Sequence, residues 1–431
     1  MSTTLLASQQ ELSKQLGDYW SSTTTSAGAS GGATVVDTAL KAKQNDWITQ
    51  ETYDLITSGT YDGEERLVVD LDNTSGILSN LAHGGQIASA VTYELHRLFS
   101  ASEKRRALIA AARQAYPNIF KTVRDESFVS GNWLKDGSFE VWTSSSALTY
   151  WTTATSTIAQ TSTAYLFEHG AYSCKLSTAA GSIMQSVSNN DDLKRLAGKS
   201  VTFKLRGWCD TADCLRIAIY DGTDYTYSDY HDGDDVWTAR NEPLEVVAKI
   251  GDNPSVIQFI IYHAVAAATS YVDDGRAMCA GTNPRIYIGN LGLAQNTPTQ
   301  VLVEPVSYAL TEPWLRVTGI VYDTSGGFMY LPENVSSDLR LRILGRGYLD
   351  FLASGVSSTA WTATIAIDNP QLDILVAQAA MNLYTEMSMP NFTQGTREKY
   401  MQMIGFWQQK YVERCNKFRM NAPSTTVNWG F

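Results

Sequence analysis

The chain has 431 residues, a formal net charge of −11 and a pI of about 5.0. Hydrophobic residues make up 44% and charged residues 18%, which excludes wholesale disorder and suggests two or three folded domains. The acidic balance excludes a broadly basic surface for nucleic acid. No run of about 18 apolar residues predicts a membrane-spanning helix. The segment Met1 to Leu6 lacks the pattern of a secretory signal, so we expect synthesis in a cytoplasm.

The first residues predict a helix. Ser8 and Glu11 have the spacing of a capping box, and the apolar residues around them lie along one helical stripe. A tract rich in Ser, Thr, Gly and Ala follows at 21–33, and its composition is typical of a flexible loop.

Short strands and a second helix are expected next. Residues 66–70 predict a strand, 72–76 a turn, and Ile77 the start of the returning strand. Ser100 and Glu103 repeat the capping-box spacing and should open a helix that ends before Pro117.

From about 127 to about 282 the pattern is almost entirely that of β-strands. Alternating apolar runs stand at 201–208, 215–220 and 256–262. Several short strands at regular spacing predict a β-sandwich.

The last part of the chain mixes strands with two helices. Strands are expected at 314–322 and 339–343, and a helix with Asp368 or Asn369 as its cap and Pro370 in its first position. A second helix should begin near Thr396.

Residues from about 134 to 281 resemble jelly-roll modules of the carbohydrate-binding type. Three segments carry the resemblance: the opening Leu134-Lys-Asp-Gly-Ser-Phe-Glu-Val-Trp142, then Leu196 to Phe203, and the closing Tyr271-Val-Asp-Asp274. The resemblance implies an α+β multidomain chain in which a helical and β host domain is interrupted by an all-β jelly-roll sandwich. The host would comprise residues 1–131 and 283–431, and the insert residues 132–282.

The same resemblance implies a structural calcium ion in the insert. Its candidate ligands are Glu140 and Asp273 or Asp274, because the first and last strands would be neighbours and calcium prefers several oxygen ligands. The alternative is that these carboxylates accept hydrogen bonds without any metal.

A candidate glycan-binding loop runs from 221 to 235. Tyr225, Tyr227 and Tyr230 offer ring faces for sugars, and carboxylates such as Asp232 accept hydrogen bonds from hydroxyl groups. A solvated hairpin connection explains the same composition, and similarity of fold does not transfer a ligand.

The flanking parts resemble neck proteins of tailed bacteriophages, of the head-to-tail connector or adaptor type. The matching segments, in chain order, are 36–40, 46–48, 56–69, 92–95, 115–117, 308–315, 339–349 and 375–387. This resemblance implies a structural protein of the virion, assembled in the host cytoplasm as a homo-oligomeric ring between the portal protein and a tail or neck protein. Genome DNA would pass through its lumen without specific binding, and the jelly roll would project outward.

Four aromatic residues near the C-terminus are candidates for contacts with neighbouring subunits or the portal: Trp407, Tyr411, Trp429 and Phe431. Packing into the protein's own core is the alternative for each of them.

No catalytic motif occurs: the chain has no G-x-S-x-G, no H-E-x-x-H and no phosphate-binding loop. We therefore expect a non-enzymatic protein. The alternatives to a neck component are a virion module that adheres to cell-surface glycans and, third, a depolymerase with paired carboxylates.

Overall fold

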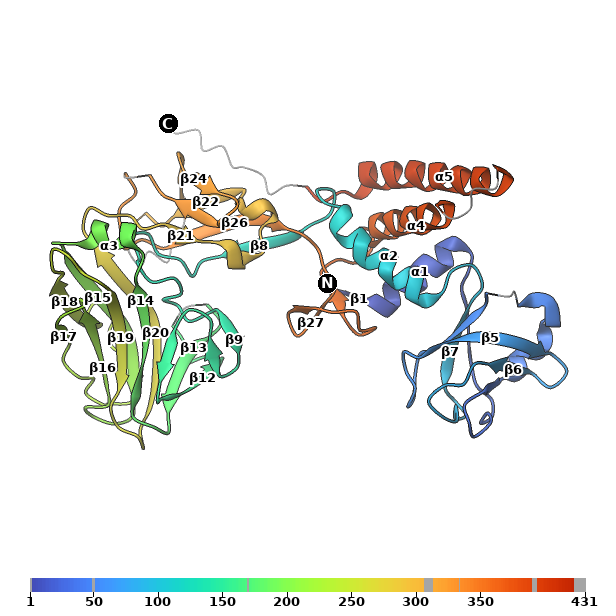
Figure 1. Ribbon diagram of the computed structural model, residues 1–431, viewed down its shortest axis with the longest axis horizontal. Coiled ribbons are helices and arrows are strands. Elements are labelled where there is room, and N and C mark those ends of the chain that lie inside the picture. Colours follow the sequence, from blue (N-terminus) through green and yellow to red (C-terminus); the bar gives the residue numbers. More distant parts are fainter. Residues whose placement is uncertain are drawn as a thin grey trace. The chain divides into compact units, whose positions relative to one another are not determined.

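The computed structural model describes residues 2–48, 51–168, 170–305, 313–332, 334–389 and 394–421. Within these ranges the chain is mostly β, with five α-helices. It divides into two compact units (Figure 1). Unit 1 comprises Met1–Lys121 and Tyr348–Phe431, and unit 2 comprises Thr122–Gly347.

Unit 1 contains four helices: α1 (Leu5–Leu16), α2 (Ala101–Gln114), α4 (Leu372–Ser388) and α5 (Gln394–Phe418). Helix α4 packs against the other three (Figure 1). Leu12, Leu108, Leu375 and Trp407, one from each helix, belong to the shared apolar core. The apolar stripes of segments far apart in the sequence therefore close a single core.

The two capping-box predictions had different outcomes. At α2 both halves of the box form between Ser100 and Glu103, which confirms the prediction. At α1 the prediction was wrong, because the helix begins earlier and its N-cap is Thr4, whose hydroxyl accepts the N–H of Ala7. Ser8 lies buried inside the helix and donates to the Thr4 carbonyl. The cap predicted for the helix near Pro370 is also wrong, since Gln371 caps α4 without a side-chain hydrogen bond.

The strands of unit 1 form two sheets. A six-stranded sheet has the order β2-β7-β4-β5-β6-β3, and a four-stranded sheet has the order β1-β29-β27-β28. Their bounds are β1 Thr3–Thr4, β2 Trp20–Thr23, β3 Thr34–Val36, β4 Tyr53–Ile56, β5 Glu65–Asp72, β6 Ile77–Asn80, β7 Thr92–His96, β27 Leu352–Ala353, β28 Val356–Ser357 and β29 Thr364–Ile365. The predicted hairpin at 66–77 is confirmed by β5 and β6, whereas β2 lies at the start of the tract predicted as a loop.

A buried lysine connects the helices of unit 1 to its larger sheet. Lys104 of α2 is fully buried, and its Nζ lies 2.8 Å from Asp18 Oδ2, 2.9 Å from Ser13 Oγ and 3.0 Å from His96 Nδ1. Burial lowers the pKa of Lys104, and the Asp18 carboxylate opposes that shift. The ion pair compensates a charge that would otherwise be costly to bury.

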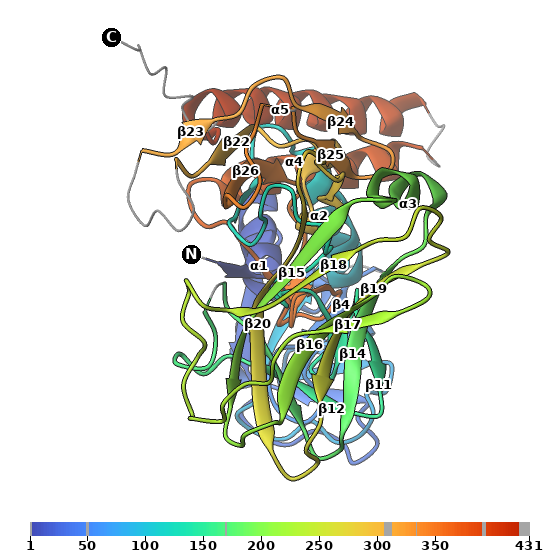
Figure 2. The same ribbon diagram turned by 90° about the vertical axis from the view of Figure 1, so that its left-hand side faces the viewer.

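Unit 2 contains the predicted β-sandwich. One five-stranded sheet has the order β11-β14-β19-β16-β17, and the other has the order β12-β13-β20-β15-β18. Figure 2 shows β14, β19, β16 and β17 side by side. The bounds are β11 Thr152–Ala154, β12 Thr157–Thr161, β13 Ser173–Ser177, β14 Gly181–Val187, β15 Ser200–Cys209, β16 Leu215–Tyr220, β17 Tyr225–Tyr227, β18 Leu244–Lys249, β19 Ile257–His263 and β20 Thr269–Cys279. A short hairpin, β9 (Trp142–Ser144) and β10 (Ala147–Leu148), precedes them, and α3 (Asn190–Leu196) follows β14.

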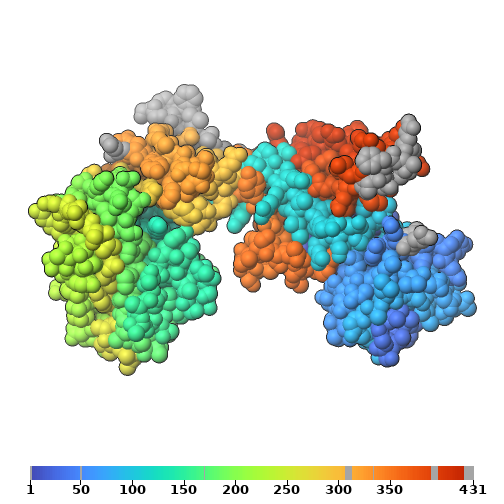
Figure 3. Space-filling model, in the orientation of Figure 1, coloured from blue at the N-terminus to red at the C-terminus, as the bar shows by residue number. Residues whose placement is uncertain are grey.

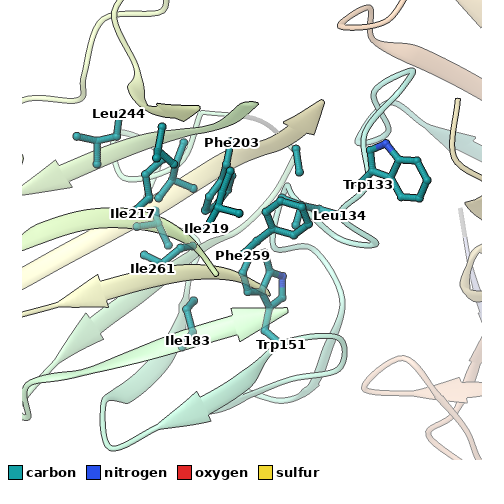
Figure 4. Close-up of a cluster of buried hydrophobic side chains, with 14 of the residues drawn as sticks. Trp133, Leu134, Trp151, Ile183, Phe203, Ile217, Ile219, Leu244, Phe259 and Ile261 are labelled. Carbon is teal, nitrogen blue, oxygen red and sulfur yellow. The ribbon is translucent and has the colours of Figure 1, made fainter. Parts of the chain in front are cut away.

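Apolar side chains from both sheets fill the interior of the sandwich (Figure 4). Phe203 of β15 and Phe259 of β19 meet edge to face with ring centroids 5.5 Å apart. Phe139 stacks on Trp151 at 5.0 Å. These contacts explain why strands β15, β16 and β19 read as alternating apolar runs in the sequence.

A smaller β region completes unit 2. Its strands are β8 (Lys121–Asp125), β21 (Ile286–Tyr287), β22 (Gln300–Val303), β23 (Leu315–Arg316), β24 (Val321–Asp323), β25 (Phe328–Tyr330) and β26 (Leu341–Gly347). They form the sheets β23-β22-β26-β8 and β21-β25-β24. The part of this region from β21 to β26, gold to orange in Figure 3, packs against the sandwich, with Tyr287 meeting Tyr150 edge to face at 6.0 Å.

The division of the chain differs from the expected boundaries. Residues 122–131 and 283–347 were assigned to the host, but the structure places them in the same unit as the sandwich. Ser130 exchanges backbone hydrogen bonds with Leu339 and Asp338, which joins the segment before the sandwich to the segment after it. Other contacts join these segments to the sandwich, such as that of Tyr287 with Tyr150. Buried Arg276 of β20 also pairs with Asp338 across the two regions.

Candidate functional site

The outer face of the sheet β11-β14-β19-β16-β17 carries the most distinctive polar and aromatic cluster. On β16, Leu215, Ile217 and Ile219 point into the core, so Arg216 and Tyr220 lie on the opposite face. The same alternation on β19 turns Phe259 and Ile261 inward and leaves Tyr262 outside.

Strand register brings these outer residues together. Arg216 of β16 lies opposite Tyr262 of β19, and Tyr220 lies opposite Tyr225 of β17. Tyr227 follows two positions after Tyr225 and therefore lies on the same face. We call Tyr220, Tyr225, Tyr227 and Tyr262 the tyrosine platform.

The rings of the platform form a continuous stack. Tyr220 and Tyr225 are 4.4 Å apart between centroids with planes 27° apart, and Tyr225 and Tyr227 are 5.9 Å apart with planes 14° apart. Tyr227 and Tyr262 are 5.9 Å apart and tilted by 45°. Tyr225 is 48% exposed and Tyr227 43%, so ring surface remains open to a ligand.

Arg216 lies against the platform. Its guanidinium carbon is 4.1 Å from the Tyr227 ring centroid, 4.6 Å from that of Tyr230 and 5.6 Å from that of Tyr262. Burial, followed by the neighbouring tyrosines, raises the pKa of Tyr262 to about 12, and Arg216 opposes the shift. The Tyr262 hydroxyl therefore stays protonated near neutral pH and can donate a hydrogen bond.

The sequence identified part of this cluster. Tyr225 and Tyr227 lie in the platform, and Tyr230 contacts it through Arg216. They stand on strand β17 and just after it, so the simple loop predicted at 221–235 is interrupted by a strand. Asp232 is exposed, with no contact to the platform among the described residues. Arg216, Tyr220 and Tyr262 were missed, although the alternation of their strands marks them as outward-facing.

The predicted calcium ligands have other partners in this structure. Glu140 Oε1 accepts the N–H groups of Ala171 at 2.9 Å and Tyr172 at 3.0 Å, and Asp273 Oδ2 accepts that of Glu168 at 2.7 Å. Asp274 makes a two-point ion pair with Arg276 at 2.9 and 3.0 Å.

These contacts do not assemble the predicted ligand set. Within the described ranges, no three His, Cys, Asp or Glu side chains are grouped so that they could hold a metal ion. Asp274 in particular is engaged by a guanidinium, which does not fit a calcium ligand. The alternative, carboxylates that accept hydrogen bonds, matches the observed contacts of Glu140 and Asp273, and calcium stays a prediction.

Two of the four predicted C-terminal contact residues, Trp407 and Tyr411, pack in the helical core of unit 1. Trp407 is 3% exposed and belongs to the helical core, so it is not available to a partner. Tyr411 packs against the same core and accepts a hydrogen bond from Asn118. Trp429 and Phe431 lie outside the described residues. The large apolar side chains exposed on α5 are instead Met401, Phe406 and Val412.

None of the helices in the described ranges could span a membrane. Neither a protein-family model nor a curated protein matches the chain.

Solved structures match about a third of the chain. TmCBM61 in complex with β-1,4-galactotriose is 14% identical, with a TM-score of 0.27 over 34% of this chain and 98% of that one. The xylan-binding domain from CBM 22 is 18% identical, with a TM-score of 0.25 over 35% of this chain and 97% of that one. The enzymatically active domain of bacteriophage CBA120 tailspike protein 4 is 11% identical, with a TM-score of 0.27 over 35% of this chain and 21% of that one. The neck interpretation, with its ring, portal and tail partners, stays a prediction.

Proposed function

We propose that this chain is a glycan-binding protein and that the tyrosine platform is its binding surface. The observation that carries the proposal is the stack of Tyr220, Tyr225 and Tyr227 on one sheet face, with the last two rings about half exposed. The exposed parts of these rings suit the apolar patches of successive sugars, and the phenol groups suit their hydroxyls.

Rigidity of the platform supports the same function. The tyrosines stand on paired strands of a sandwich and stack on one another, so binding costs little side-chain entropy. Gln258, opposite Tyr220 on β19, adds an amide on this face. We propose that the protein binds without cleaving, and that adhesion of a virion to cell-surface glycans is the setting.

Glycan-array binding followed by calorimetry tests the proposal. The Tyr225→Ala, Tyr227→Ala double variant should bind roughly tenfold more weakly or worse, because each stacked aromatic contact is worth about 0.5–1.5 kcal/mol. Tyr165→Ala is the matched control, since Tyr165 is 73% exposed and takes no part in the platform. An array without any hit, or equal losses in both variants, would refute the proposal.

A further inference from the structure

We infer that the platform selects acidic glycans, whose sugars carry carboxylates, and that Arg216 is the residue that recognises the carboxylate. This inference rests on the proposed function and adds the chemical class of the ligand.

Arg216 lacks an anionic partner among the described residues. Within the part of the chain that the structure describes, it takes part in no ion pair, and its Nε is buried without a hydrogen-bond partner. Three other arginines of unit 2 do have such partners, since Arg206 and Arg240 pair with Glu168, and Arg276 pairs with Asp274. With 44 acidic residues against 33 basic ones, a shortage of carboxylates does not explain this difference.

Arg216 also carries the one charge among the outward side chains of strands β14, β19 and β16. The outward residues of β14, β19 and β16 are Ser182, Met184, Ser186, Gln258, Ile260, Tyr262, Arg216, Ala218 and Tyr220. Arg216 is the charged one among them, and the structure describes these three strands completely. Along these three strands, a ligand therefore meets a single cation among aromatic, apolar and neutral polar side chains.

The guanidinium of Arg216 is held in position before any ligand binds. The guanidinium lies over the rings of Tyr227, Tyr230 and Tyr262, and these cation–π contacts hold it in place. Because Nε is the buried nitrogen, the two terminal nitrogens are the ones open to a ligand. Two parallel N–H donors in one plane match the two oxygens of a carboxylate.

The three rings around Arg216 should also strengthen its interaction with a carboxylate. Flanking rings exclude water from part of the guanidinium, and a less hydrated cation interacts more strongly with an anion. If Arg216 had only a structural role and merely held the tyrosine rings in position, the protein would show no preference for a charged ligand. The two roles therefore differ in a measurable selectivity.

The experiment compares acidic polysaccharides with their own carboxyl-reduced forms, using the full chain. The probes are polygalacturonate, alginate and hyaluronan, each tested before and after reduction of its carboxylates to alcohols. We expect at least one acidic form to bind roughly tenfold or more tightly than its reduced form, as hydrogen bonds to charged groups contribute about 1.5–3 kcal/mol.

Two variants of Arg216 assign that preference. Arg216→Gln should bring binding of the acidic form down to that of the reduced form. Arg216→Lys should retain part of the preference for the acidic form, because lysine keeps the charge but lacks the planar pair of N–H donors. Lys249→Gln, an exposed residue of β18 on the other sheet, removes the same charge and should change nothing. Thermal melting of each variant separates unfolding from lost recognition, and Arg216→Lys is informative even where the Gln variant unfolds.

The possible outcomes distinguish a failure of this inference from a failure of the proposed glycan-binding function. Equal binding of acidic and reduced forms, or a preference that survives in Arg216→Gln, overturns the inference while the glycan-binding function stands. If the protein binds neutral galactan or xylan but no acidic polysaccharide, the inference is likewise overturned and the glycan-binding function stands. Absence of binding to every charged and neutral polysaccharide overturns both.

Discussion

Replacing Glu140 with Gln tests whether the first segment of the sandwich holds a metal ion or instead contains a buried carboxyl group that binds a proton. One oxygen of Glu140 accepts both backbone N–H groups from 171 and 172, and the amide oxygen of Gln can accept the same pair. Burial, which outweighs these two hydrogen bonds, raises the Glu140 pKa from 4.5 to about 7. The substitution therefore keeps the contacts and removes the cost of ionising a partly buried group.

Linkage between proton binding and folding gives the sign and size of the expected change in stability. A raised folded-state pKa means that Glu140 contributes full stability below pH 4.5 and loses it as the pH rises through about 7. A shift from 4.5 to about 7 corresponds to roughly 3 kcal/mol at 1.36 kcal/mol per unit, and partial exposure of Glu140 reduces this to about 2 kcal/mol. At pH 8 without metal, Glu140→Gln should be more stable than the wild type by about that amount. Near pH 4 the two should be equal.

Urea denaturation from pH 4 to pH 8, with chelator and then with calcium, measures the difference. Glu242→Gln, an exposed change, serves as control. If Glu140→Gln is the less stable protein at pH 8 in chelator, the reasoning about the buried carboxyl group is wrong. If the chelator lowers the melting temperature of the wild type, and calcium restores it only while Glu140 is present, the predicted calcium site is supported.

Three further predictions concern the units and the chemistry. Joining Lys121 to Tyr348 through a short linker, with 122–347 removed, should leave the helices of unit 1 folded by circular dichroism, because their core uses residues of unit 1; an insoluble product would count against this. Lys104→Met should lower the free energy of unfolding by about 3 kcal/mol in urea, since Asp18 loses its buried cation; a change below about 1 kcal/mol would show that the pair contributes little. Incubation with the bound polysaccharide should release no reducing ends, and their steady release would show catalysis.

Local patterns in the sequence predict well where the deciding contacts are local. Ser100 and Glu103 face each other across one turn of helix, so their spacing contains nearly all the information needed for the capping box. Ser8 and Glu11 have the same spacing, yet Thr4 is also a good cap and lies one turn earlier. When two candidate caps stand a turn apart, packing of Leu5 and Leu12 decides which one is used, and the sequence alone does not show that packing.

The boundary of unit 2 depends on non-local pairing. Strand patterns after 283 are visible in the sequence, but nothing in them indicates which other segment they join. In the structure β8 forms the edge of the sheet that contains β22 and β26, so residues before and after the sandwich make one sheet. Contacts of these strands with the sandwich, such as the ion pair of Arg276 with Asp338, then place 283–347 in the inserted unit rather than in the host. A resemblance that covers only the sandwich contains no information about such a neighbour.

The tyrosine platform shows how both kinds of information combine in one site. Alternation along β16 and β19 is enough to place Arg216 and Tyr262 on the outer face, and the sequence could have yielded that. It could not have shown that the two stand opposite each other, because a shift of one residue in register would turn one of them into the core. The apolar partners on the inner face, such as Ile217 against Ile261, therefore fix the register. Since that register sets which rings surround the guanidinium, the interior of the sandwich determines the chemistry of its surface.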